Sequence, residues 1–284
     1  AAFLVGVIAA VAGGRPGMIS GATGAMAVVL VGLGDAARDH LGLTAGDDPG
    51  WLSGVLLAYI TLAVLLAGGL QVLAGVLRLG RFIRLVPHSV VLGFVNGLAI
   101  IIFLAQLTQF VDPASGEWLA PGALTLMLGL VAATMLVIWG LPKRTGAVPA
   151  PLVAIAAVTL AVIATGLDTT RVGDLAAVGG SLPAFALPGF DDAVRTAAAA
   201  DGVVLPAFWS WSTLWLVLPF SGILAAVGLI ESLMTMSLID EMTDTRGRGN
   251  RECIGQGLAN GACGVFGAMG GCAMVGQSMI NIQS

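Results

Sequence analysis

Two segments far apart in this chain place glycines and hydroxyl or amide side chains inside otherwise apolar sequence. They are Ser20, Gly21, Thr23 and Gly24 near the start and Gly276, Gln277 and Ser278 near the end. Irregular backbone survives at membrane depth only where protein buries it or where it lines a polar cavity. If each break begins a half-helix, its free N–H groups and positive dipole end would bind an anion without a lysine or arginine. Glycine kinks that only ease helix packing are the alternative.

One acidic residue stands inside a long apolar run. Glu231 lies between Leu216 and Leu238, and Thr235 follows four residues later, which places its hydroxyl on the same helix face. A carboxylate near the membrane centre costs about 3 kcal/mol on insertion scales, so it normally faces a cavity and has a function. We expect Glu231 to couple an ion or to shape the site. A protonated core residue with only a packing role is the alternative.

The composition indicates that membrane-spanning helices position these groups. Hydrophobic residues make up 57% of the 284 residues and charged residues only 10%, against roughly 25% charged in a soluble domain. Apolar runs long enough to cross a hydrocarbon core of about 30 Å recur along the chain. We expect full spans near 51–75, 86–108, 122–141, 148–166 and 212–238. Shorter or interrupted spans are expected at 1–13, 19–34, 253–271 and 274–284.

The loops between the spans alternate in charge. Basic clusters follow three spans and are Arg78, Arg81 and Arg84, then Lys143 and Arg144, then Arg246, Arg248 and Arg251. The intervening loops are mainly acidic. Because loops rich in lysine and arginine stay on the cytoplasmic side, we expect these basic loops to be cytoplasmic and the protein to be integral to the inner membrane.

A glycine-rich apolar stretch covers 252–271. The spacing of Gly257, Gly261 and Gly264 puts a smooth ridge on one helix face, which favours a close packing seam over ligand contact. The cysteines lack metal or disulfide spacing, so we expect buried thiols that act as small hydrophobes. They are Cys253, Cys263 and Cys272.

The longest stretch without a span covers 167–211, and we interpret it as an outer connector between two halves of the fold. The chain begins inside an apolar run without a methionine and ends at Ser284 without a polar tail. We therefore expect it to be a piece of a longer protein.

The sequence resembles the SulP family of sulfate permeases and solute-carrier anion transporters over essentially its whole length. The most specific matches are LVPHSVVLGFVNG at 85–97, the span around Glu231, and GGCAMVGQSMINIQS at 270–284. The resemblance implies an all-α polytopic membrane protein with two inverted repeats of seven segments. Half-helices in segments three and ten would meet at the membrane centre, and a cytoplasmic STAS domain would lie outside this chain.

The resemblance also implies how the chain divides. Residues 1–166 would carry segments two to seven, of which two to four belong to the core and five to seven to the gate. The connector would be 167–211, and residues 212–284 would carry segments eight to ten. The chain would thus run from the end of segment two to the start of segment ten.

By the same resemblance, the anion would lie between the N-termini of segments three and ten. Segment three would supply Ser20, Gly21, Ala22 and Thr23, segment ten would supply Val275, Gly276, Gln277 and Ser278, and segment eight would supply Glu231 and Thr235. Animal relatives commonly have an arginine at the position of Gln277. The sodium-coupled bicarbonate branch has aspartate at the position of Glu231 and threonine at that of Val275. Val275 offers no side-chain oxygen to a cation, which weakens a sodium site near Glu231, whereas Thr235 and backbone carbonyls still provide oxygens.

We therefore expect a secondary transporter, not an enzyme, that moves a small inorganic anion by alternating access. Sulfate is the first substrate, bicarbonate the second and chloride the third. Glu231 would bind a co-transported H⁺ or Na⁺. We expect no other cofactor or firm metal site and no nucleic-acid partner, and we expect a homodimer for the full-length form.

Three alternatives remain open at this point. A nucleobase permease of the uracil or xanthine type would share the architecture, but Gln277 stands where a second carboxylate is expected. An intramembrane hydrolase would use Ser20 or Ser278 with His88, but no third group that could orient the histidine is apparent. A membrane module that does not transport is the third.

Overall fold

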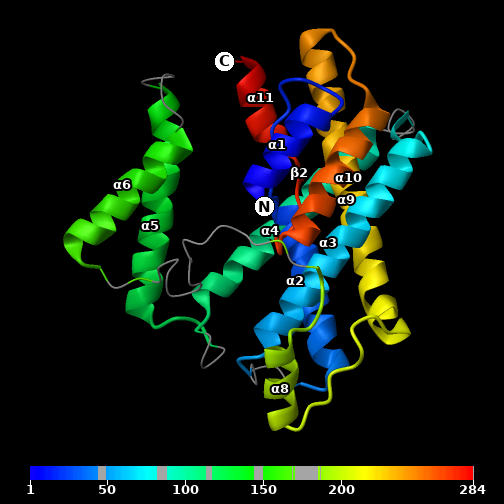
Figure 1. The fold of residues 1–284 in the computed structure, drawn as a ribbon. Coiled ribbons are helices and arrows are strands. Elements are labelled where there is room, and N and C mark those ends of the chain that lie inside the picture. The colour runs from blue at the N-terminus through cyan, green and yellow to red at the C-terminus, as the bar shows by residue number, and fades with distance from the viewer. Residues whose placement is uncertain are drawn as a thin grey trace. The chain divides into compact units, whose positions relative to one another are not determined.

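The computed structural model describes residues 1–43, 49–81, 88–112, 117–143, 150–167, 169, 185 and 187–283. In these ranges the chain is almost entirely helical (Figure 1). The helices are α1 (Ala2–Ala12), α2 (Gly24–His40), α3 (Leu52–Val76), α4 (His88–Leu107), α5 (Pro121–Gly140), α6 (Ala150–Thr165), α8 (Asp192–Ala200), α9 (Trp211–Thr243), α10 (Gly249–Val265) and α11 (Val275–Gln283). Short 3₁₀ turns cover Thr108–Phe110 and Leu141–Lys143, and two strands are β1 (Ser20–Gly21) and β2 (Cys272–Ala273).

Every expected span contains a helix. Among the described residues, three helical stretches are long and apolar enough to cross a membrane, namely Leu52–Val76, Pro121–Lys143 and Trp211–Thr243. Helices α2 and α9 run past the apolar runs from which they were predicted, to His40 and Thr243. Helix α9 ends where Asp244 takes a left-handed conformation, with φ at 50°. Hydropathy indicates where a segment lies in the membrane core, whereas backbone conformation determines where the helix ends. The end of the apolar run and the end of the helix therefore differ.

The chain forms two compact units, of which unit 1 is Ala1–Ile102 with Leu182–Ser284 and unit 2 is Phe103–Ser181. Within unit 2, α5 and α6 pack against each other. These units describe packing, so the repeat boundaries expected at 166 and 212 stay a prediction. Much of the connector expected over 167–211 lies outside the described residues, and its described part includes helix α8.

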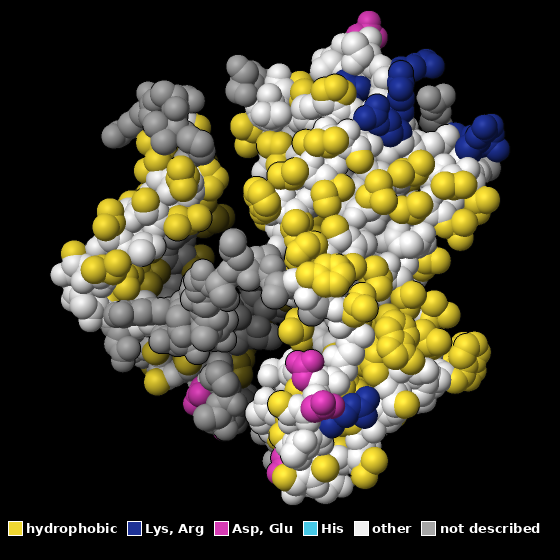
Figure 2. Space-filling model, viewed as in Figure 1, with side chains coloured by type: hydrophobic (Ala, Val, Ile, Leu, Met, Phe, Trp, Pro, Cys, Tyr) yellow, Lys and Arg dark blue, Asp and Glu magenta, His cyan; other side chains and the backbone are white. Residues whose placement is uncertain are grey.

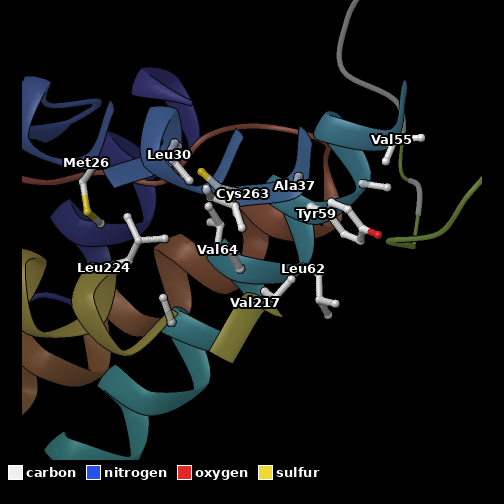
Figure 3. Close-up of a cluster of buried hydrophobic side chains, with 14 of the residues drawn as sticks. Met26, Leu30, Ala37, Val55, Tyr59, Leu62, Val64, Val217, Leu224 and Cys263 are labelled. Atoms are coloured by element: carbon white, nitrogen blue, oxygen red, sulfur yellow. The ribbon is translucent and has the colours of Figure 1, made fainter. Parts of the chain in front are cut away.

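The core of unit 1 is built around α3. Apolar side chains from α2, α3, α9 and α10 meet in one buried cluster (Figure 3). Its members include Met26, Leu30, Tyr59, Leu62, Val217, Leu224 and Cys263. Cys263 is fully buried there, which confirms the expectation of a thiol that packs as a small hydrophobe.

Helices α3 and α10 pack with their backbones in close contact. A Cβ atom added to Gly68 on α3 would lie 2.5 Å from the backbone N of Gly261 and 2.7 Å from the carbonyl O of Gly257. On α10, a Cβ atom at Gly264 would lie 2.7 Å from the backbone N of Leu65. The predicted packing seam is therefore confirmed, because a side chain at Gly68 or at Gly264 would separate the helices.

Charge and hydrophobicity are distributed on unit 1 as expected for a protein that crosses a membrane. Apolar side chains that include Leu57, Leu73 and Trp215 are exposed along the long helices. In the visible face of Figure 2, most lysine and arginine side chains gather where α9 ends and α10 begins. The chain is thus an integral membrane protein whose apolar surface faces lipid.

Candidate functional site

The two breaks predicted from the sequence are hydrogen-bonded to each other. Strand β1 pairs antiparallel with β2, with Ser20 opposite Ala273 and Gly21 opposite Cys272. The backbone N–H of Met274 extends this pairing by donating to the carbonyl O of Ile19 at 2.8 Å. Chain segments about 250 residues apart thus form one small sheet.

Each strand leads directly into a helix N-terminus. Helix α2 begins at Gly24, one residue after the extended N-cap Thr23, and α11 begins at Val275. The first N–H groups of both helices therefore have no partner within their own helix. The expectation that each break begins a helix is confirmed.

The order helix, two-residue strand, helix occurs twice, as α1–β1–α2 and as α10–β2–α11. The two strands pair antiparallel, so a local two-fold axis relates β1 to β2. This arrangement agrees with the inverted repeats that the resemblance implies.

A glycine permits the close approach of the two breaks. A Cβ atom added to Gly271 would lie 2.1 Å from the carbonyl O of Gly21. That oxygen belongs to the backbone of β1, so it cannot move away without opening the strand pair. The glycine-rich end of the 252–271 stretch is therefore required for the pairing of the breaks.

The carboxyl group of Glu231 is connected to the first break through a thiol. The thiol of Cys272 donates to Glu231 Oε2 at 2.9 Å, and its sulfur lies 3.1 Å from Thr23 Oγ1. Cys272 was predicted to act only as a small hydrophobe. Its burial agrees with that prediction, but its place between a carboxylate and a hydroxyl makes it a polar member of the site.

Helix α9 also holds the second break through hydroxyl groups. The backbone N–H of Ala273 donates to Ser232 Oγ at 3.0 Å. The hydroxyl of Thr235 lies 2.8 Å from the carbonyl O of Glu231 and 3.4 Å from that of Ala273. The predicted pair Glu231 and Thr235 thus lies against β2, on the face of α9 that touches the site.

The remaining predicted residues differ in exposure. Ser278 is fully buried, and its Oγ accepts from the backbone N–H of Ile19 at 2.9 Å, so it joins the two breaks. Gly276 and Gln277 are exposed, whereas Ala22 and Val275 are half-buried. The side chain of His88 lies outside the described residues, so the alternative that pairs it with a serine gains no support.

Sequence reasoning missed a row of polar residues on α10. Glu252, Gln256 and Asn260 lie four residues apart, on one helix face, and all three are buried. Asn260 Oδ1 accepts from the backbone N–H of Gly271 at 2.7 Å, and its Nδ2 donates to the carbonyl O of Gly271 at 3.0 Å and to Gln71 Oε1 at 2.8 Å. The four-residue spacing in a glycine-rich apolar helix was the signal available in the sequence.

Replacing Asn260 by leucine is expected to destabilise the second break. Leucine fills a similar volume but leaves the N–H and C=O of Gly271 and the amide of Gln71 buried without these partners. Each buried polar group that loses its partner costs about 1–3 kcal/mol. The apparent Tm of the purified protein in detergent should fall by several degrees.

Asn250→Leu provides the matched control for this measurement. Asn250 lies in the first turn of the same helix, and its Oδ1 accepts no hydrogen bond from the described residues. Equal Tm values for the two variants would contradict the role given to Asn260.

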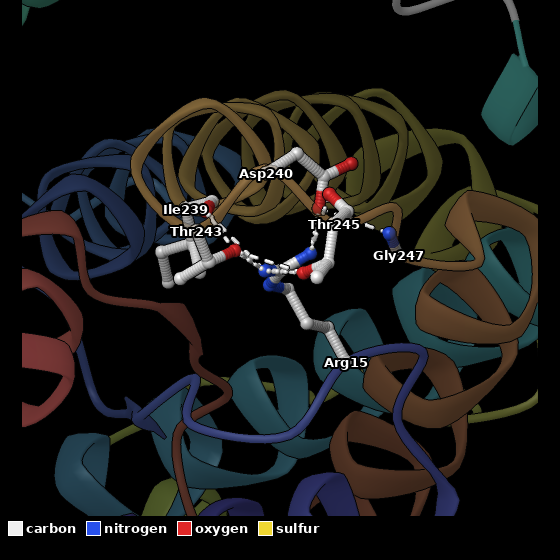
Figure 4. A network of polar contacts seen from close by, with 6 residues as sticks. All are labelled: Arg15, Ile239, Asp240, Thr243, Thr245 and Gly247. Atoms are coloured by element: carbon white, nitrogen blue, oxygen red, sulfur yellow. Dashed lines mark hydrogen bonds and ion pairs between the residues drawn. The ribbon is translucent and has the colours of Figure 1, made fainter.

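A second polar cluster ties the segment after α1 to the end of α9. The guanidinium of Arg15 pairs with Asp240 and donates to the hydroxyls of Thr243 and Thr245 (Figure 4). Asp240 in turn accepts from the backbone N–H of Gly247 at 2.9 Å. This cluster was also missed by the sequence analysis. It connects the segment that leads from α1 to the first break with the end of α9, the helix that carries Glu231.

A cavity of about 450 Å³ lies near this cluster, between the end of α9 and the start of α10. Its lining includes Arg81, Asp240, Arg248 and Arg251. None of the predicted site residues lines it, so it is separate from the paired breaks.

Comparison with known proteins gives one family over nearly the whole chain. The model of the sulfate permease family matches residues 1–117 and 119–284. The putative sulfate transporter YbaR of Bacillus subtilis is 40% identical over 284 residues, which are 100% of this chain and 50% of the relative. The bicarbonate transporter BicA of Synechocystis is 31% identical over 297 residues, which cover 100% of this chain and 47% of that protein. The chain thus spans about half the length of the curated relatives it matches.

Solved structures agree with the fold. The transmembrane domain of a cyanobacterium bicarbonate transporter BicA matches with a TM-score of 0.73 at 28% identity, over 99% of this chain and 68% of that chain. The structure of SLC26A9 matches with a TM-score of 0.67 at 13% identity, over 99% of this chain and 44% of that chain, which shows a shared fold alone.

Proposed function

This chain belongs to the sulfate permease family, and from that premise we propose that the full-length protein moves a small inorganic anion across the membrane by alternating access. It acts as a transporter and not as an enzyme. The observation that carries the proposal is the pairing of β1 with β2, which brings the N-termini of α2 and α11 together at one site. Two helix dipoles that converge in this way stabilise a negative charge between them.

The anion is bound by neutral groups of both breaks. The first turns of α2 and α11 contain no lysine or arginine, so backbone N–H groups and side-chain donors must replace the water around the anion. The hydroxyls of Ser20 and Thr23 and the amide of Gln277 supply these donors, while Ser278 holds the breaks together. Ala22, Val275 and Gly276 shape the backbone around the anion.

Sulfate and bicarbonate are the first substrates to test. Relatives are named as transporters of each, and both are small oxyanions that accept several hydrogen bonds. A buried dianion costs more to desolvate than a monoanion, so the number of donors decides between them.

Glu231 couples anion movement to H⁺ or Na⁺. Its carboxyl group contacts Cys272 next to the site, so its charge acts on the same small volume as the anion. A positive ion bound at Glu231 offsets the charge of the anion while both cross the membrane. Val275 offers no side-chain oxygen for Na⁺, although Thr235 and nearby carbonyl groups do.

The core carrying the anion moves as one body. Opening the site between the breaks would disrupt the β1–β2 pair and the contact of Ser278 with Ile19, so we place the movement between core and gate instead. Basic loops face the cytoplasm, and the full-length protein forms a homodimer in the inner membrane.

The test is uptake of labelled sulfate and bicarbonate by the full-length protein in proteoliposomes, with an imposed proton or sodium gradient. We expect accumulation of one anion that depends on one gradient and is competed by the unlabelled anion. Transport or binding of uracil without uptake of either anion would contradict the proposal and favour a nucleobase permease. The absence of any flux would favour a module that does not transport.

A further inference from the structure

The buried row on α10 includes a second carboxylate, Glu252, that the proposed function does not use. Its side chain is 2% exposed and accepts two hydrogen bonds. The backbone N–H of Gly14 donates to Oε2 at 2.7 Å, and Gln256 Nε2 donates to Oε1 at 2.8 Å. Both carboxylate oxygens therefore act as acceptors, and both donors are uncharged.

The same amide nitrogen reaches the first break. Gln256 Nε2 also donates to Ser20 Oγ at 2.7 Å, and Gln256 is fully buried. Its Oε1 accepts no hydrogen bond from the described residues. A short series of hydrogen bonds thus runs from the start of α10 to strand β1, through Glu252, Gln256 and Ser20.

The carboxylate fixes the orientation of the glutamine amide. Turning the amide over would place Gln256 Oε1 against Glu252 Oε1, where two acceptors would repel each other. With Nε2 facing both oxygens, the hydroxyl of Ser20 accepts a hydrogen bond and keeps its own proton. Among the described residues, no acceptor takes that proton.

We propose that Glu252 and Gln256 are positioning residues that hold the Ser20 hydroxyl as a donor to the transported anion. Glu252 orients Gln256, and Gln256 occupies a lone pair of Ser20 Oγ, so that the hydroxyl proton is directed to the anion. This inference rests on the proposed function, because it deepens the role of Ser20 in anion binding. Preorganised donors bind more tightly because no reorientation is needed on binding.

The critical variant is Glu252→Gln, which keeps size and shape. Its Oε1 still accepts from Gly14, but its Nε2 now faces Gln256, which must turn its Oε1 toward it. Ser20 then meets an acceptor and must donate to it, so the anion loses this hydrogen bond. A purely structural tie between α1 and α10 would tolerate the glutamine. Glu252 belongs to neither of the described ion pairs, Arg15–Asp240 and Arg38–Asp35, so the variant breaks neither of them.

We would measure KM and Vmax for anion uptake by the full-length protein in proteoliposomes. Glu252→Gln is expected to raise the KM about tenfold, as Ser20→Ala does, because a hydrogen bond to a charged acceptor is worth about that factor. Vmax should stay within about twofold, since the movement itself is unchanged. In the Ser20→Ala background, Glu252→Gln should have no further effect on KM.

Two further variants keep the test decisive. Gln256→Met removes the amide and keeps a side chain of similar length. It should raise KM in the protein that retains Ser20 but not in the Ser20→Ala background. KM does not depend on the fraction of protein that folds, so a loss of active protein would lower Vmax alone. Cys253→Ala, a change at the buried neighbour of Glu252, is the control and should leave KM unchanged.

The outcomes distinguish a failure of this inference from a failure of the proposed function. If Ser20→Ala raises KM while Glu252→Gln does not, or if their effects multiply in the double variant, this inference is wrong and the proposed function stands. If Ser20→Ala leaves KM unchanged, or if the protein takes up no anion, the proposed site fails and this inference fails with it.

Discussion

Glu231→Gln is expected to abolish gradient-driven accumulation of the anion. In a coupled transporter that moves one H⁺ or Na⁺ with each anion, a tenfold gradient of the coupling ion sustains about tenfold accumulation, since each factor of ten is about 1.4 kcal/mol. Glutamine can still accept from the thiol of Cys272 through its Oε1, so the contact at the second break persists. It can neither take up a proton nor carry charge, so the accumulation ratio should fall to about one.

The measurement is the steady-state ratio of labelled anion inside and outside proteoliposomes under the imposed gradient. Glu241→Gln, an exposed carboxylate near the end of the same helix, is the matched control and should accumulate anion normally. Exchange of labelled for unlabelled anion without a gradient should persist in Glu231→Gln, because both helix N-termini remain. Unchanged accumulation in this variant would disprove the coupling role.

Gly257→Ala is expected to destabilise the protein strongly. A Cβ atom there would lie 2.6 Å from the carbonyl O of Gly68 and 2.6 Å from the backbone N of Val72. Both are backbone atoms of α3, so relief requires the two helices to separate along their seam. Overpacking of this kind costs about 1–3 kcal/mol even where side chains can adjust, and we expect at least the upper end here.

Gly261→Ala is the matched control on the same helix, one turn further along. A Cβ atom at Gly261 meets no atom within 4 Å outside its own helix turns. Alanine favours a helix over glycine by about 1 kcal/mol, so this variant should be as stable as the parent or slightly more so. The apparent Tm in detergent decides, and a loss at Gly261 as large as that at Gly257 would refute the assignment of the contact.

The helices could be predicted because a membrane imposes a length and a polarity on each segment. The apolar run at 51–75, for example, agrees closely with the observed helix α3 at Leu52–Val76. The breaks could be predicted because Ser20 and Gly21 are out of place at membrane depth. What no local pattern contains is that these residues pair with Ala273 and Cys272, because that contact depends on how distant helices pack.

The contacts around the breaks were harder to predict than the breaks themselves. From the sequence alone, Cys272 was interpreted as a small apolar residue. Its thiol becomes a polar contact only because the fold places Glu231 and Thr23 beside it. Gln256 and Asn260 were overlooked because the glycines of α10 drew the interpretation toward packing. Helix α10 has both a packing face and a polar face, because its glycines pack on α3 while Gln256 and Asn260 contact the two breaks.

The seam between α3 and α10 also has a consequence for biosynthesis. About 170 residues separate the end of α3 from the start of α10, which corresponds to roughly 10–35 s of translation at about 5–20 residues per second. Through that interval, Gly68 on the nascent α3 lacks the helix that covers it, and Gln71 lacks the amide of Asn260. The newly made helix therefore keeps an open glycine face and lacks the amide partner of Gln71 until α10 is synthesised.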